Sequence, residues 1–361
     1  MSKRQRNKRR RDMIRRRQLL KIAAAVFLLV AAVLMLPMCQ SEGAKETQED
    51  VIGVWISYGD FDTLGLYNQN ENGFRKNADT FLDKVEEYGI NTVYFHVRAF
   101  RDAVYKSEHF PMASYVWDRS ENIDYDPLQV MTELTHEHGM ELHAWMNPYR
   151  NSSFEENILD PASKKTRKEI LLCVGEVIDN YDVDGIHFDD YFYEEANTLP
   201  ESEKKKNVNK MVRAVYEKVH ASGRNLVFGI SPAGNTSYCA EIGADVETWL
   251  TEEGYVDYIV PQIYWTDEHT APWRDDMFTD TLDEWIALNK NDAELYIGLA
   301  AYKAGLDEEA DPGWENRNDN LAVQVQQIRE KNCDGYVFFS ATDFYRNGAS
   351  EELGNYRNLV F

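Results

Sequence analysis

From residue 51 to residue 361, short apolar runs alternate with longer stretches in which apolar residues recur every three or four positions. The first pattern predicts buried β-strands and the second predicts amphipathic helices. Gly89 and Gly139 follow helical stretches, and Asp126-Pro127 and Asp160-Pro161 precede them, as helix stop and start signals do. The eight expected strands are Val51–Ser57, Thr92–Val97, Glu141–Met146, Gly185–Asp189, Leu226–Ser231, Tyr258–Ile263, Leu295–Ala300 and Gly335–Ser340.

Strands that alternate with helices form parallel pairs, because a parallel connection needs a crossover. Eight strand–helix units over residues 51–361 predict an α/β fold of the TIM (β/α)8 barrel type, with an open doubly wound sheet as the alternative. Helix-to-strand links are short, whereas strand-to-helix links such as 98–125 and 301–319 are long and contain aromatic residues. We therefore expect a functional site at the carboxyl ends of the strands.

The amino-terminal segment has a different pattern. Residues 1–21 contain eleven Lys or Arg and one Asp, and residues 22–38 are an uncharged apolar run. This order is typical of a membrane anchor or a secretion signal. One interpretation is a transmembrane segment at 22–38 with 1–21 as a cytoplasmic tail, and the other is a cleaved signal, with or without lipid on Cys39. Both place the barrel outside the cytoplasm at the cell membrane, after a polar linker at 39–50.

Charge and cysteine usage narrow the class of ligand. The net charge is −23, and because residues 1–21 carry +10, the remainder carries −33. An acidic body argues against nucleic acid, which needs a basic face. The four cysteines show neither metal-ligand spacing nor a disulfide framework, so we expect no metal and no other cofactor.

The most informative segment is Asp184–Tyr191, where an apolar strand ends in the adjacent acids Asp189 and Asp190. Acids are uncommon in strands, and catalytic groups of barrels lie at strand ends. Two carboxyl groups this close cannot both ionise freely, so one pKa should rise, as a general acid requires. Because glycoside hydrolysis most often uses two carboxyl groups, Asp189 and Asp190 are the candidate catalytic residues. Either could instead cap a turn or pair with a cation.

Polar and aromatic residues follow most of the other expected strands. If Asp189 points into the barrel mouth, alternation along the strand places His187 and Tyr191 on the same side. Such a mouth is typical of a glycan site, because aromatic rings suit the apolar faces of sugars. His96 could equally be a hydrogen-bonded interior histidine. The predicted substrate-binding residues are His96, Arg98, Asn147, Tyr149, His187, Tyr191, Asn235, Gln262, Tyr264, Trp265, Tyr302 and Asp343.

Several longer phrases resemble a known family. They are Val54-Trp55-Ile56, Asp184–Tyr193, Ile230-Ser231-Pro232, Val256–Trp265 and Gly335–Ser340. Together they resemble the glycosyl hydrolase-like 10 family over residues 51–361. The resemblance implies a TIM-barrel glycosidase of bacterial envelopes that acts on cell-wall glycan. It also implies a peptidoglycan substrate, since at least one member cleaves glycan strands stripped of their peptides.

The fourth strand is also similar to that of two better-understood barrel groups. In the α-amylases its last Asp is the nucleophile and a Glu ends the fifth strand, but Leu226–Pro232 contains no Glu. In the O-GlcNAcase-type hexosaminidases two adjacent Asp residues follow strand four. That resemblance implies that Asp189 orients the substrate's acetamido group and that Asp190 is the general acid. The alternatives are a retaining glycosidase with Asp189 as nucleophile and a loop acid such as Asp267 or Asp343, and a non-catalytic barrel that binds glycan.

Overall fold

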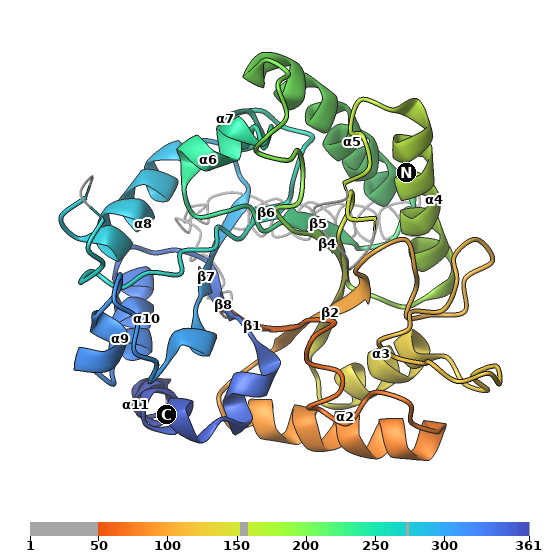
Figure 1. Ribbon diagram of the computed structural model, residues 1–361, viewed down its shortest axis with the longest axis horizontal. Coiled ribbons are helices and arrows are strands. Elements are labelled where there is room, and N and C mark those ends of the chain that lie inside the picture. Colours follow the sequence, from red (N-terminus) through yellow and green to blue (C-terminus); the bar gives the residue numbers. More distant parts are fainter. Residues whose placement is uncertain (1–49, 152–157, 272–273, 361) are drawn as a thin grey trace, which may run out of the picture. The chain divides into compact units, whose positions relative to one another are not determined.

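The computed structural model describes residues 50–151, 158–271 and 274–360, and in this part of the chain eight parallel strands form a closed barrel (Figure 1). Each strand pairs with its neighbours in sequence, and β8 closes the ring against β1. The predicted (β/α)8 barrel is confirmed, and the open-sheet alternative is wrong. The strands are β1 Val51–Ile56, β2 Thr92–Arg98, β3 Glu141–Met146, β4 Gly185–Phe188, β5 Val227–Ile230, β6 Tyr258–Ile259, β7 Glu294–Leu299 and β8 Gly335–Phe338.

Helices surround the barrel (Figure 1). Asp126 begins one of them as expected, because its side chain accepts backbone N–H groups of the first turn and Pro127 follows it. Asp160-Pro161 begins none, because Ser163 is the N-cap of the next helix. The α-helices are α2 Glu71–Glu86, α3 Pro127–Glu137, α4 Lys164–Asn180, α5 Glu201–Ala221, α6 Thr236–Glu241, α7 Val246–Trp249, α8 Met277–Leu288, α9 Gly313–Asn316, α10 Asn320–Glu330 and α11 Ser350–Val360. The short 3-10 helices are η1 Ala301–Lys303, η2 Ala341–Tyr345 and η3 Asn347–Ala349.

Alternation along the strands creates two separate cores. Outward-facing side chains such as Phe95 and Ile186 belong to a large apolar layer shared with the helices. Inward-facing side chains fill the barrel with aromatic rings, so the interior is packed rather than hollow. This second cluster consists of Trp55, Tyr94, Trp145, Tyr258, Val260, Tyr296 and Val337.

Gly229 on β5 makes room for one of these rings. It pairs with Tyr258 on β6, and a Cβ at this position would overlap the Tyr258 ring. The Tyr258 hydroxyl lies 2.8 Å from Nδ1 of His143 and 3.1 Å from Nδ1 of His187. A missing side chain on β5 thus allows a polar contact among β3, β4 and β6.

The amino ends of the strands share a repeated contact. The residue immediately before each even-numbered strand is Asn or Asp, and its side chain accepts a backbone N–H from the preceding odd-numbered strand. These bonds add to the backbone ladders and hold the strands of each pair in register. The contacts are Asn91 with Ile52, Asp184 with Leu142, Asp257 with Phe228 and Asp334 with Leu295.

The predicted tail at 1–21, the apolar segment at 22–38 and Cys39 lie outside the described residues, as does the linker at 39–50 apart from Asp50. None of the described helices is both long and apolar enough to cross a bilayer. The membrane-anchor and signal interpretations therefore stay predictions.

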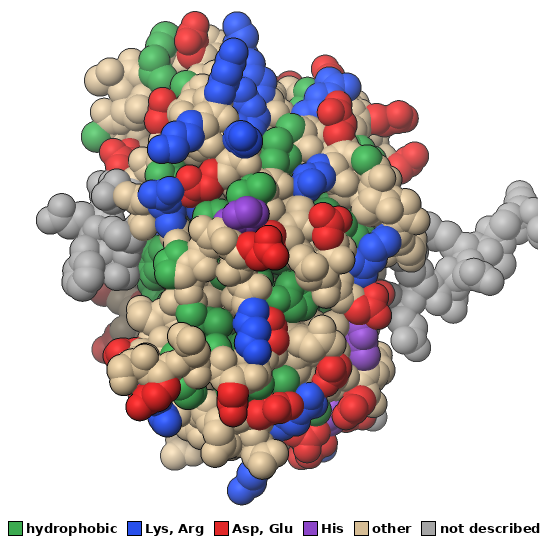
Figure 2. Space-filling view, turned by 90° about the vertical axis from the view of Figure 1, so that its right-hand side faces the viewer, with side chains coloured by type: hydrophobic (Ala, Val, Ile, Leu, Met, Phe, Trp, Pro, Cys, Tyr) green, Lys and Arg blue, Asp and Glu red, His purple; other side chains and the backbone are tan. Residues whose placement is uncertain are grey.

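Positive charge is local on the face shown in Figure 2. Lys and Arg side chains gather near the top of this face, at the height of α5, and Asp and Glu side chains are spread over the rest. The outer side of α5 contributes Lys205, Lys206, Lys210 and Arg213 to one groove. These four cations do not change the acidic character of the chain, whose net charge is −23.

We predict that Gly229→Ala destabilises the barrel by about 1–3 kcal/mol, because the added methyl group would displace the Tyr258 ring from its histidine partners. Chemical denaturation followed by circular dichroism measures the change. Gly354→Ala in α11 is the control, since a Cβ there meets nothing within 4 Å, and it should be neutral or slightly stabilising. Unchanged stability of Gly229→Ala would contradict the close approach of β5 and Tyr258.

Candidate active site

A pocket of about 380 Å³ lies at the carboxyl ends of the strands. Every strand or the loop that follows it contributes to the lining, except β7 and its loop. The position agrees with the site predicted from the long strand-to-helix loops. The lining residues are Trp55, Ser57, Tyr58, Gly59, His96, Trp145, Asn147, Arg150, Asp189, Asp190, Tyr191, Ser231, Gln262, Tyr264 and Phe339.

Asp189 and Asp190 follow β4 side by side in this pocket. Asp189 is only 3% exposed, and Asp190 is half-buried. Burial raises the pKa of Asp189 well above its usual value, the charge of Asp190 raises it further, and Arg150 opposes the rise. Burial raises the pKa of Asp190 to about 6, opposed by Gln262 and Arg150. The pair therefore keeps a proton at pH values where an isolated carboxyl group has lost it.

His96 on β2 fixes the orientation of the Asn147 amide. The backbone N–H of Tyr58 donates to Nδ1 of His96 at 3.3 Å, so Nε2 carries the proton. Burial holds the pKa of His96 well below its usual value, which keeps the ring neutral. Nε2 lies 2.9 Å from Oδ1 of Asn147 and donates to it. The Asn147 Nδ2 group is consequently left to donate elsewhere.

Three buried polar atoms of the pocket residues have no hydrogen-bond partner in the described part of the chain. They are Oδ2 of Asp189, Nδ2 of Asn147 and Nε1 of Trp145, and the Trp145 N–H lies close enough to Asp189 to lower the pKa of that carboxyl group. Leaving such atoms unpaired costs about 1–3 kcal/mol each, so a partner is expected from a bound ligand or water. The acceptor Oδ2 of Asp189 and the donor Nδ2 of Asn147 match an amide group, which offers one N–H and a carbonyl oxygen.

Aromatic rings form the walls of the pocket. Trp145 stacks on His96 with ring centres 3.8 Å apart, and Tyr264 stacks on Phe339 at 6.0 Å. Tyr191, which is 40% exposed, lies at the pocket edge. Flat apolar walls with a few polar groups between them are suited to a sugar ring.

His187 lies beneath the pocket instead of lining it. Trp55 Nε1 donates to its Nε2 at 3.1 Å, and the Ser231 hydroxyl lies 3.1 Å from the same nitrogen. Burial holds the pKa of His187 well below its usual value, so the ring is neutral. In place of the predicted sugar contact, the structure shows His187 supporting two lining residues, Trp55 and Ser231.

Arg98 also departs from its predicted place. The pairing of β2 with β3 shifts between His96 and Arg98, so simple alternation fails at this point. The Arg98 side chain is buried, lies over the Phe110 ring, and donates to the backbone oxygen of Asn147 at 2.6 Å. Arg98 therefore supports the Asn147 backbone from outside the pocket.

Three other predicted site residues make structural contacts elsewhere. Tyr149 is buried beside Phe192, and Asn235 is the N-cap of α6. Asp343 pairs with Arg346 at 2.9 Å. Their polar groups follow strand ends as expected, but the loops turn them into caps and packing contacts.

Trp265 and Tyr302 stand behind the pocket lining. The Tyr302 ring packs edge-on against Tyr264 at 5.7 Å and against Phe339 at 5.9 Å. Trp265 is half-buried and packs on the apolar layer outside the barrel, close to Gly234. Both residues therefore shape the pocket through their neighbours.

Seven of the fourteen predicted site residues do line the pocket, and sequence reasoning missed several others. Alternation from Ser57 and Asn147 places Trp55 and Trp145 inward, and this is the signal that could have found them. Tyr58 and Phe339 carry no comparable signal. The seven predicted residues that line the pocket are His96, Asn147, Asp189, Asp190, Tyr191, Gln262 and Tyr264.

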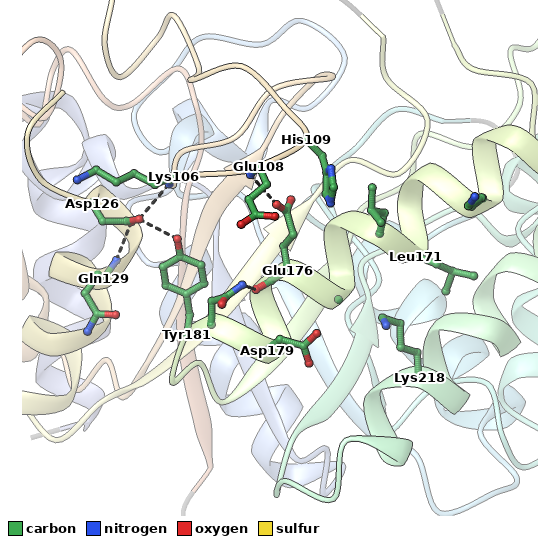
Figure 3. A pocket seen from close by; sticks show the side chains of 14 residues that line it. Lys106, Glu108, His109, Asp126, Gln129, Leu171, Glu176, Asp179, Tyr181 and Lys218 are labelled. Atoms are coloured by element: carbon green, nitrogen blue, oxygen red, sulfur yellow. Dashed lines mark hydrogen bonds between the residues drawn. The ribbon is translucent and has the colours of Figure 1, made fainter. Parts of the chain in front are cut away.

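A larger cavity of about 770 Å³ lies outside the barrel, against α3, α4 and α5 (Figure 3). Its acids bind the loop that covers it. Asp126 accepts the Tyr181 hydroxyl at 2.7 Å and the Lys106 backbone N–H at 2.9 Å, and Glu176 accepts the Glu108 backbone N–H at 2.8 Å. These contacts fasten the 98–125 loop to the helices, so this cavity is a structural feature.

A closed (β/α)8 barrel with an acid pair and aromatic walls at its carboxyl end is an arrangement suited to a glycoside hydrolase. The chain belongs to the glycosyl hydrolase-like 10 family, whose sequence model matches residues 50–157 and 195–316. The two matched ranges flank the Asp189–Asp190 pair.

Curated relatives agree with this assignment. The chain is 30% identical over 300 residues to glycosyl hydrolase DigH of Escherichia coli K12, covering 64% of this chain and 67% of the relative. It is 28% identical over 328 residues to glycosyl hydrolase YngK of Bacillus subtilis, covering 74% of this chain and 63% of the relative.

Solved structures of low sequence identity share the fold. The glycoside hydrolase domain of PgaB (BpsB) from Bordetella bronchiseptica superposes with a TM-score of 0.57 at 14% identity, covering 84% of this chain and 97% of that domain. The Ostrinia furnacalis Group IV chitinase gives a TM-score of 0.59 at 10% identity, covering 86% of this chain and all of that one (100%).

We predict that Asp189→Asn is more stable than the wild type at pH 8 by on the order of 1 kcal/mol, with the difference disappearing near pH 4. The folded protein holds the Asp189 proton more tightly than the unfolded chain, so wild-type stability falls as the pH rises through this range. Thermal unfolding at both pH values measures the effect. Asp343→Asn is the control, because loss of the Arg346 partner should destabilise the protein at pH 8. Lower stability of Asp189→Asn at pH 8 would contradict an uncompensated buried carboxylate.

Proposed function

We propose that this protein hydrolyses N-acetylated cell-wall glycan of the peptidoglycan type, and that Asp189 and Asp190 act on a substrate-assisted pathway. The observation that carries the proposal is that Oδ2 of Asp189 and Nδ2 of Asn147 are buried and unpaired among the described residues, as an acceptor and a donor complementary to an acetamido group. Membership of a glycosyl hydrolase-like family supports the reaction class. The aromatic walls support a sugar as the ligand.

In the proposed first step the acetamido N–H donates to Asp189 and stabilises its carboxylate, so that the proton of the pair lies on Asp190. Asn147 orients the acetamido carbonyl group. The carbonyl oxygen attacks the anomeric carbon as the bond from that carbon to the leaving oxygen breaks. Asp190 gives its proton to the leaving oxygen. In the second step water attacks the anomeric carbon, the acetamido group is restored, and Asp190 takes the proton of the water. The anomeric configuration is retained.

The rival pathway, with Asp189 as nucleophile, needs a general acid from a loop. Asp267 accepts both the backbone N–H and the hydroxyl of Thr279, at 2.8 Å each, and Asp343 pairs with Arg346. Neither acid lines the pocket. The adjacent pair therefore supports the substrate-assisted pathway better. A covalent glycosyl adduct on Asp189 would favour the rival.

The purified protein should release products from peptide-free peptidoglycan glycan and from chitin oligomers, and none from maltooligosaccharides, as read by mass spectrometry. The reason is that only the first two carry the 2-acetamido group that the pathway requires. Efficient turnover of a glucan without 2-acetamido groups would contradict the substrate-assisted pathway. Glycan binding with no product from any substrate would point to a non-catalytic binding barrel.

Asp190→Asn should lower kcat on glycan by about 10²–10⁴-fold, because the leaving oxygen loses its proton donor. A 4-nitrophenyl glycoside, whose leaving group needs no proton, should lose far less. Wild-type activity on glycan should fall as the pH rises above about 6, where Asp190 loses its proton, and the 4-nitrophenyl substrate should show no such fall. Equal losses on both substrates would argue against Asp190 as the acid.

The proposal includes a tether that holds the barrel outside the cytoplasm beside an insoluble substrate. The order of basic and apolar residues in 1–38 supports it. Deleting residues 1–38 should move the protein from the membrane fraction to the soluble fraction. Cys39→Ser would give the same shift only if lipid on Cys39 is the anchor, and membrane association that survives the deletion would contradict the tether.

A further inference from the structure

Arg150, in the loop after β3, lines the pocket and is surrounded by aromatic rings. Its guanidinium lies over the ring of Tyr191 at 4.3 Å, over Phe100 at 5.1 Å and over Tyr58 at 5.7 Å. A backbone bridge to Ile158 holds the main chain at this point. The cation is therefore restrained before a ligand binds, which lowers the entropy cost of using it.

The N–H groups of Arg150 have no partner in the described ranges 50–151, 158–271 and 274–360. Neither Asp189 nor Asp190 forms an ion pair with Arg150, although its positive charge lowers the pKa of both carboxyl groups. Arg101 differs in this respect, since its guanidinium donates twice to the Glu169 carboxylate, at 2.6 and 2.8 Å. Because an arginine carries five N–H donors and does not lose its proton, the pocket offers an anion site beside the acid pair.

The geometry of the guanidinium group favours one kind of anion. A planar carboxylate accepts two parallel hydrogen bonds from the fork of its N–H groups. Tyr191 comes from the loop after β4, next to Asp190, so the anion site adjoins the reacting groups.

We propose that Arg150 binds a carboxylate carried by the sugar in this pocket, and that the enzyme therefore selects acidic amino-sugar glycan over its neutral counterpart. The inference rests on the proposed function, because it names the substituent recognised in the same site. The carboxylate could belong to an ether-linked lactyl group or to C6 of a uronic acid, and the experiment separates these sources.

The test compares three probes with the full-length wild-type protein and with Arg150→Gln and Arg150→Lys. The first probe is a peptide-free N-acetylglucosamine–N-acetylmuramic acid oligomer, and the second is the same oligomer with its lactyl carboxylate converted to a methylamide. The third is a hyaluronan oligomer, which carries its carboxylate at C6. Arg119→Gln is the matched control, because Arg119 also stacks on an aromatic ring, Trp117 at 5.0 Å, but outside the pocket.

The wild type and Arg119→Gln should prefer the free carboxylate to the methylamide by about 10- to 100-fold in kcat/KM. Arg150→Gln should abolish that preference, and Arg150→Lys should restore part of it. Preference for hyaluronan over the muramic oligomer would assign the carboxylate to C6. No wild-type preference, or equal losses on both muramic probes in Arg150→Gln, would overturn the proposal and leave Arg150 acting on the acid pair.

Binding separates this inference from the proposed function. If no probe is cleaved, the hydrolase proposal fails, and calorimetry with Asp190→Asn still measures whether the free carboxylate binds more tightly than the methylamide. The same ratio measured in Asp190→Asn carrying Arg150→Gln should fall to about one. Equal affinities for the two probes in Asp190→Asn would overturn the role of Arg150 whatever the reaction is.

Discussion

The hydroxyl of Tyr258 joins two histidines inside the barrel, and the floor of the pocket depends on that contact. Nε2 of His187 accepts the Trp55 indole N–H, so Nδ1 carries the proton and donates to the Tyr258 oxygen. The Tyr258 hydroxyl is then free to donate to Nδ1 of His143. Donors and acceptors alternate along this path from Trp55 to His143, and at its far end Nε2 of His143 lies 3.6 Å from the Glu141 carboxylate. Trp55, at the upper end of the path, lines the pocket.

Two buried carboxyl groups at the same end of the barrel differ in their hydrogen-bond partners. Asp60 accepts the backbone N–H and hydroxyl of Ser57 and the hydroxyls of Ser340 and Thr342, and so joins the loop after β1 to the loop after β8. Asp189 is buried to a similar degree, but its Oδ2 has no partner among the described residues. Asp60 therefore joins two loops at the mouth of the barrel. Asp189 is buried with an unpaired oxygen, which is unfavourable in the free protein and is relieved when a polar ligand supplies the missing partner.

The strand and helix order followed from hydrophobic periodicity, because period-2 and period-3.6 patterns are local properties of the chain. The acid pair could be found for a similar reason, since Asp189 and Asp190 interrupt an apolar strand at its end. Arg98 was misplaced because an irregular pairing of β2 with β3 changes which side chains face inward, and no local pattern records it. The sequence placed Arg150 after the third strand, near the barrel mouth, but its surroundings could not be predicted because they come from rings on three other loops.

The Asn and Asp side chains before the even-numbered strands act at the end of the barrel opposite the pocket. Each of these four hydrogen bonds forms in one alignment of the strands only. A shift by one residue would place the Asn or Asp side chain opposite a position whose N–H points the other way. The same slip would turn His187 and Asp189 toward the helices and send apolar residues into the barrel. The alignment of the pocket residues is thus set at the other end of the barrel, about a strand's length away, and substitutions there would misalign the pocket without touching it.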